Sequence, residues 1–71
     1  MKSKYYIVSG ELAVVILGYN AMDAAMSAIV NFPDRVLGDI VMVNQHGFDG
    51  PITIMDTYLY TEDLLSQLGL L

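Results

Sequence analysis

Two segments of this chain are apolar on both faces of the strand that each would form, which limits the folds that can accommodate them. Residues 12–17 are an uninterrupted run of six apolar residues, three of them β-branched. Residues 40–43 repeat the pattern in a shorter form. A strand with one dry face and one wet face alternates apolar and polar residues. Both segments therefore need cover on two sides, and the chain must supply it or leave an apolar face open.

Little chain is present to provide that cover. With 71 residues the sequence is sized for a single small domain over residues 1–71. Because a domain of about 60 residues buries only about 60% of its unfolded surface, its core is small. A composition of 55% hydrophobic and 15% charged residues argues against intrinsic disorder. The longest apolar run is far below the roughly 20 residues that span a bilayer, so we do not expect a membrane protein.

The first half of the chain predicts a β-hairpin followed by a helix. Residues 5–8 and 12–17 form the strands, and Gly10 between them can take the positive φ of a tight turn. Asn20 is placed to cap the helix, with Asp23 reaching back in the manner of a capping box. Apolar side chains then recur at helical spacing: Met22, Ala25, Met26, Ile29 and Val30. Pro33 ends this helix.

The second half predicts two further strands and a short helix. Residues 39–44 are expected to form the third strand, 45–51 a loop and 52–60 the fourth strand. Thr61 is expected to cap the last helix, and Gly69 to end it in a Schellman-type turn. The buried stripe of this helix would be Leu64, Leu65 and Leu68. The predicted order is ββαββα, an α+β fold with a small, mainly antiparallel four-stranded sheet and two helices on one face.

Two short helices can cover one face of such a sheet, and nothing in the sequence is left to cover the other. An open apolar face would be a patch of several hundred Å², which soluble monomers rarely expose. We therefore expect a homodimer, a higher homo-oligomer or half of a hetero-complex. The candidate contact residues are Tyr5, Val15, Leu17, Val41 and Val43. A shift of one residue in strand facing would exchange the two sets of side chains.

Three other interpretations stay open. A compact monomer with the hairpin buried inside the sheet, in an order such as 2-1-4-3, would need no partner. The charge of −5, from three basic and eight acidic residues, fits an acidic regulator or inhibitor that docks on a basic, nucleic-acid-binding surface of another protein. A small-ligand cavity between protomers would draw on the methionines: Met22, Met26, Met42 and Met55.

The sequence carries no diagnostic catalytic or metal-binding motif. His46 is the only histidine, and a metal site would have to combine it with Asp49 and with Asp39 or Asp56. These residues lack the ligand spacing of zinc or calcium sites. The serines sit in no recognisable nucleophile motif: Ser9, Ser27 and Ser66. We expect no enzymatic activity, no catalytic residues, no metal and no cofactor.

The remaining composition bears on partners and location. Lys2, Lys4 and Arg35 are the only fixed cations, too few for direct nucleic-acid binding, and the five tyrosines lack interleaved basic residues. The apolar stretch near the start is interrupted at residues 9–11, which disfavours a secretory signal. Together with the absence of cysteine, this is compatible with a cytoplasmic protein.

Overall fold

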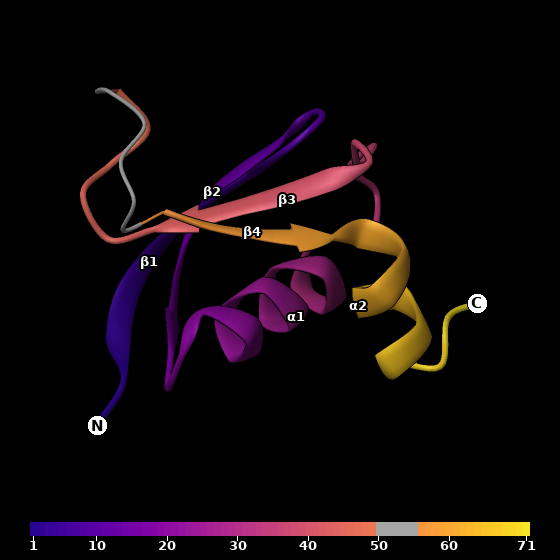
Figure 1. Ribbon diagram of the computed structural model, residues 1–71, viewed down its shortest axis with the longest axis horizontal. Coiled ribbons are helices and arrows are strands. Elements are labelled where there is room, and N and C mark those ends of the chain that lie inside the picture. Colours follow the sequence, from indigo (N-terminus) through magenta and orange to yellow (C-terminus); the bar gives the residue numbers. More distant parts are fainter. Residues whose placement is uncertain (50–55) are drawn as a thin grey trace.

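The protein forms one antiparallel four-stranded sheet with two helices on the same side of it (Figure 1). The computed structural model describes residues 1–49 and 56–71. The elements in chain order are β1 (Ser3–Ser9), β2 (Leu12–Gly18), α1 (Ala21–Asn31), β3 (Ile40–Asn44), β4 (Thr57–Tyr60) and α2 (Thr61–Gln67). This ββαββα order and the placement of the helices confirm the predicted α+β fold class.

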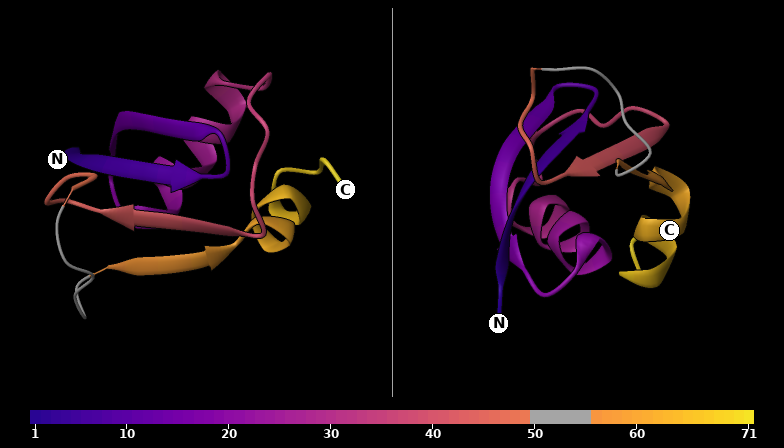
Figure 2. Two further views of the ribbon diagram at one scale, coloured as in Figure 1. Left: turned by 90° about the horizontal axis from the view of Figure 1, so that it is seen from above. Right: turned by 60° about the vertical axis from the view of Figure 1, so that its left-hand side comes forward.

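The strands are arranged in the order β2-β1-β3-β4, so β1 lies inside the sheet and β2 forms one edge. Figure 2 shows the first hairpin at one side of the sheet and β4 at the other. Tyr6 pairs with Val15 of β2 on one side and with Asn44 of β3 on the other. The order differs from the 2-1-4-3 arrangement of the alternative compact monomer. Consequently the apolar strand β2 is not enclosed between neighbours within the described chain.

The start of α1 follows the capping that its sequence predicts. The Asn20 side-chain oxygen accepts a hydrogen bond from the Asp23 amide at 2.8 Å. The Asp23 carboxylate in turn accepts from the Tyr19 amide at 2.9 Å, one residue before the position that a capping box would use. The helix ends at Asn31, two residues before Pro33. The bond from the Asp23 amide to Asn20 satisfies a backbone donor that the first turn of a helix leaves free.

The start of α2 differs from the prediction, and the expected Thr61 cap is wrong. Tyr60 occupies the cap position without a side-chain hydrogen bond, and Thr61 is the first helical residue. The Thr61 hydroxyl donates instead to the Gly38 carbonyl at 2.6 Å, and its amide donates to the Asp39 carbonyl. The buried threonine therefore ties the helix to the segment that leads into β3.

The end of α2 confirms the predicted Schellman turn. Gly69 has a φ of +74°, in the left-handed region that favours glycine. The Leu70 amide donates to the Leu65 carbonyl at 2.8 Å, and the Gly69 amide donates to the Ser66 carbonyl at 3.1 Å. These are the two bonds that define the motif.

The described part of the fourth strand is β4, the carboxyl-terminal end of the expected segment 52–60. Residues 52–55 of that prediction lie outside the described residues. Leu59 packs against the core from β4, whereas Tyr58 and Tyr60 are exposed. The alternation along β4 thus matches a strand that covers the core with one face only.

The core lies between the sheet and the helices. Its buried apolar residues are Ile7, Leu12, Ala24, Ala25, Ala28, Ile29, Val41, Val43 and Leu64. Small alanines on α1 let the helix approach the sheet closely: a Cβ added at Gly18 would lie 2.9 Å from atoms of Ala24. Such an approach leaves no room for a side chain at position 18. Both described helices lie on this side, so no described helix covers the other side of the sheet.

The turn of the first hairpin is packed against the segment before β3. The Ser9 hydroxyl, which is buried, donates to the Ile40 carbonyl at 2.8 Å and accepts from the Gly38 amide at 3.0 Å. Gly10 has a φ of +56°, and a Cβ there would lie 2.6 Å from the Val36 carbonyl oxygen. The hairpin and the connection from α1 to β3 therefore form one packed unit.

Candidate functional site

The side of the sheet away from the helices carries a continuous set of apolar side chains, which we call the open sheet face. Strand alternation puts on this face every residue that neighbours a core position such as Ile7, Val41 or Leu59. The cross-strand pairs then set the members side by side. They are Lys4, Tyr6, Val8, Ala13, Val15, Leu17, Ile40, Met42, Tyr58 and Tyr60, with the buried polar residue Asn44 at the end of β3.

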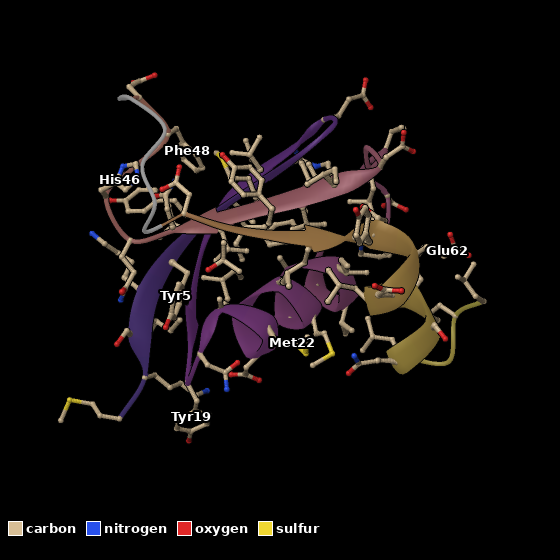
Figure 3. The ribbon with its side chains drawn as sticks, in the orientation of Figure 1. Tyr5, Tyr19, Met22, His46, Phe48 and Glu62 are labelled. Atoms are coloured by element: carbon tan, nitrogen blue, oxygen red, sulfur yellow. The ribbon has the colours of Figure 1, made fainter. Side chains whose placement is uncertain are left out.

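Most of the large side chains of the open sheet face are exposed. The exposed fractions run from 40% for Ile40 to 65% for Tyr60. Phe48, from the loop after β3, packs edge-on against Tyr6 with ring centroids 5.1 Å apart. In Figure 3 Phe48 lies on the upper side of the sheet and Tyr5 on the lower, helix-covered side. Phe48 thus extends the apolar surface beyond the strands.

The open sheet face carries a single charged side chain, that of Lys4, among the described residues. Its ammonium lies 5.4 Å from the centre of the Tyr6 ring, in a cation–π contact. No described aspartate or glutamate belongs to the face. A surface of this kind suits an apolar partner better than a strongly basic one.

The structure separates the five predicted contact residues between the two faces of the sheet. Val15 and Leu17 belong to the open sheet face and are exposed. Val41 and Val43 lie in the core, at 0% and 1% exposure, and Tyr5 packs against that core. The physical reason is the one-residue shift in facing noted above. Because β3 is apolar at successive positions, its sequence gives no alternation that would select a face.

Their neighbours take the places of Tyr5, Val41 and Val43 on the open sheet face. Tyr6 replaces Tyr5, and Ile40 and Met42 replace the two valines. Tyr58 and Tyr60 were not among the predicted contact residues. Their signal in the sequence is the spacing of two aromatic residues at i and i+2 in a strand, on the face opposite Leu59.

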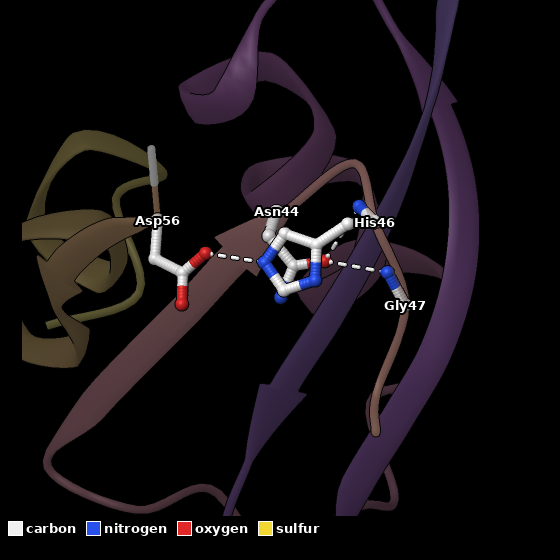
Figure 4. Close-up of polar contacts among 4 residues, drawn as sticks. All are labelled: Asn44, His46, Gly47 and Asp56. Carbon is white, nitrogen blue, oxygen red and sulfur yellow. Dashed lines mark hydrogen bonds and ion pairs between the residues drawn. The ribbon is translucent and has the colours of Figure 1, made fainter. Parts of the chain in front are cut away.

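Of the polar candidates, the structure brings together His46 and Asp56. The Nε2 atom of His46 lies 2.6 Å from Oδ1 of Asp56, whose carboxylate is only 1% exposed (Figure 4). The Asn44 side-chain oxygen accepts hydrogen bonds from the amides of His46 and Gly47, which fixes the turn that carries the imidazole. The sequence leaves Asp56 and Asp39 as alternative partners of His46 and does not decide between them, because ten residues and a loop separate His46 from Asp56.

The combination of His46 with Asp49 and with Asp39 or Asp56, which the sequence disfavours as a metal site, is not grouped in the described part of the chain. Within residues 1–49 and 56–71, no three histidine, aspartate or glutamate side chains are grouped so that they could hold an ion. The buried Ser9 hydroxyl is engaged with the backbone of Gly38 and Ile40. It therefore forms no pair with His46 of the kind that activates a nucleophile.

The acidic residues gather in part near the start of α2. Asp39, Glu62 and Asp63 line a pocket of about 920 Å³ together with Arg35. Asp56 is at the opposite end of the sheet, beside His46. The acid excess therefore does not form one continuous face, although three carboxylates share one pocket.

The described methionines of this set, Met22, Met26 and Met42, do not line one cavity. Met22 and Met26 pack against the core from α1, while Met42 belongs to the open sheet face. The sheet therefore lies between the two groups. Met55 lies outside the described residues.

Comparisons of the chain with protein-family models, curated proteins and solved structures found no match. Within the part of the chain that the structure describes, none of the helices has the length and apolar character needed to cross a membrane. The interpretation of the site therefore rests on its geometry and chemistry.

Proposed function

We propose that this protein is a non-enzymatic, self-associating structural or interaction module in which two copies pack through their open sheet faces. The observation that carries the proposal is the exposed, nearly uncharged apolar surface on the side of the sheet that no described helix covers. The largest exposed apolar patch of a soluble protein is often a functional surface.

The charge distribution favours a second copy at this surface. Each chain carries a formal charge of −5, so two copies repel one another over most of their surfaces. The described carboxylates lie off the open sheet face, on loops and at helix starts such as Glu62. Two copies that meet through this face keep their acidic groups apart and desolvate no carboxylate.

The size of the face sets an expectation for the strength of association. At about 4.8 Å between strands and 3.3 Å per residue, the strands project to roughly 360 Å² on each copy. Two copies would together bury about twice that projected area. The uneven side-chain surface and Phe48 would add further buried area. This is near the lower limit of about 1,000 Å² for specific interfaces, so the dimer should dissociate on dilution.

The assembly would have four layers. A two-fold axis would place the same residues of both copies in contact, as an isologous interface requires. The two sheets would pack about 10 Å apart, with the helices of each copy on the outside. The strands that are apolar on both faces would then be buried on both.

The test is the light-scattering mass after gel filtration over about a hundred-fold dilution, for the wild type, Val15→Asp and Val36→Asp. Val15 belongs to the open sheet face, whereas Val36 is exposed in the connection before β3. We expect a concentration-dependent dimer for the wild type and Val36→Asp, and a monomer for Val15→Asp. A wild type that is monomeric at all concentrations would refute self-association.

A second candidate function is an acidic regulator that docks on a basic surface of another protein. The observation that favours it is the pocket shared by Asp39, Glu62 and Asp63. Binding through this pocket would weaken steeply with salt, because exposed charges are screened within about 8 Å at 0.15 M ionic strength. Dimerisation through the open sheet face would not weaken in this way. Salt titration of the dimer mass and of binding to a polylysine probe separates the two functions.

A further inference from the structure

A second pocket, of about 560 Å³, lies at the end of the sheet where β3 finishes, and most of its walls come from the helix-covered side. Tyr5, Val43 and Thr57 contribute its walls from β1, β3 and β4, and Ala21 contributes from the first turn of α1. Figure 3 shows Tyr5 and His46 at the same end of the molecule. Its volume is in the range of pockets that hold small molecules.

The rim of this pocket carries the one imidazole of the protein, held in a defined orientation. His46 lines the pocket, and its Nε2 is bonded to the buried carboxylate of Asp56. In the uncharged tautomer whose Nε2 donates to the Asp56 carboxylate, Nδ1 is a hydrogen-bond acceptor. No hydrogen bond to Nδ1 is found among the described residues.

The turn that supports His46 is itself fixed. Asn44 is 4% exposed, and its side-chain oxygen receives two backbone hydrogen bonds, at 3.1 Å from His46 and 2.9 Å from Gly47. An imidazole positioned from both its backbone and its ring loses little conformational entropy when it binds a ligand. This arrangement exceeds what is needed to pack a loop residue that is 38% exposed in its side chain.

The lining defines the ligand chemistry. None of the fixed cations lines the pocket, so an anion would find no counter-charge from lysine or arginine. The walls provide an aromatic ring, aliphatic carbons and a threonine. We propose that this pocket binds a small neutral molecule with a flat apolar body and one hydroxyl or N–H group, which donates a hydrogen bond to His46 Nδ1.

The probe for this site is p-cresol, which has an apolar ring and one hydroxyl donor. The matched control probe is 4-methylanisole, in which a methyl group replaces the donor hydrogen. Both are titrated into ¹⁵N-labelled protein while amide shifts are recorded. We expect saturable shifts at Tyr5, Ala21, His46 and Thr57, and about fivefold weaker binding of 4-methylanisole, as one net hydrogen bond gives.

Two variants separate the polar contact from the cavity. His46→Phe keeps a ring at the rim but removes the acceptor, so p-cresol should bind no more tightly than 4-methylanisole. Ala21→Leu leaves His46 in place and fills part of the pocket, so both probes should bind at least several-fold more weakly. Leucine is a good helix former, and α1 should tolerate it at its first residue.

Two results would overturn the site. One is the absence of saturable shifts up to about 10 mM probe in folded wild-type protein. The other is a set of shifts centred on Val15, Met42 and Tyr58, which would show that the probe binds the open sheet face. Equal affinity of the two probes for the wild type would refute the role of His46. Tyr5, Ala21 and Thr57 line the pocket from the helix-covered side, so their shifts are distinct from those of residues on the open sheet face.

Discussion

Tyr6 and Val15 are directly paired across β1 and β2, and both side chains stand on the side of the sheet that no described helix covers. Ile7 and Val14, the next pair along, point into the helix-covered core. The two faces of one hairpin are therefore similar in composition and different in environment. This difference makes the effects of substitution depend on which face a residue occupies.

The first prediction contrasts two valine-to-aspartate substitutions. Val41→Asp places an unpaired charge in the core and should destabilise the fold by more than about 4 kcal/mol, enough to unfold a domain of this size. Val15→Asp should remain folded, since Val15 is exposed. Circular dichroism during urea titration measures both. If the two variants were equally unstable, the assignment of Val15 to the open sheet face would be wrong.

The second prediction concerns the cap of α1. Asn20→Ala removes the acceptor of the Asp23 amide and should lower the free energy of unfolding by about 1 kcal/mol. Asn31→Ala, at the other end of the same helix, is the control and should change stability by less than about 0.5 kcal/mol. Urea unfolding midpoints give the comparison. A loss that is the same at both positions would contradict the capping role.

The third prediction separates two glycines with positive φ. Gly10→Ala meets both an unfavourable φ and a backbone oxygen at 2.6 Å, so it should prevent stable folding. Gly69→Ala has the same kind of φ but nothing within 4 Å of the added carbon, and should cost only about 1–2 kcal/mol. Thermal unfolding followed by circular dichroism distinguishes them. A well-folded Gly10→Ala protein would show that the hairpin turn is not packed as described.

The fourth prediction tests the contact between α2 and the segment before β3. Thr61→Val keeps the shape of the side chain but removes the hydroxyl that donates to Gly38. The expected loss is about 1–3 kcal/mol, because the position is buried and the carbonyl loses a partner. Thr61→Ser, which retains the hydroxyl, should recover part of this loss in the same urea titration. A valine variant as stable as the wild type would contradict the role of the hydroxyl.

The order of the helices and strands could be predicted from the sequence. The side of the sheet on which each β3 side chain lies could not. Local signals such as the Asn20 cap and the Gly69 turn depend on neighbouring residues, and both were predicted correctly. The facing of Val41 and Val43 depends on which side the helices take. Because β3 is apolar at every position from 40 to 43, its sequence does not indicate which of its side chains face the helices.

Contacts between distant residues could not be predicted for a related reason. Thr61 followed by acidic residues has the appearance of a helix cap, yet the Gly38 carbonyl, 23 residues earlier, takes its hydroxyl. The pair of His46 and Asp56 is likewise created by the return of the chain from β3 to β4. In each case a residue distant in sequence determines the role of the side chain. The periodicity of the sequence does not indicate which residue that is.

The packing of the Ser9–Gly10 turn against Gly38 has a consequence for the order of folding. A tight hairpin is ordinarily a local structure that closes within microseconds. Here the turn is completed by hydrogen bonds to a residue 29 positions later, after the whole of α1. The first hairpin and the third strand should therefore become stable in one step. We expect the closure of this long loop to be part of the folding nucleus, so substitutions at Ser9 should slow refolding as well as speed unfolding.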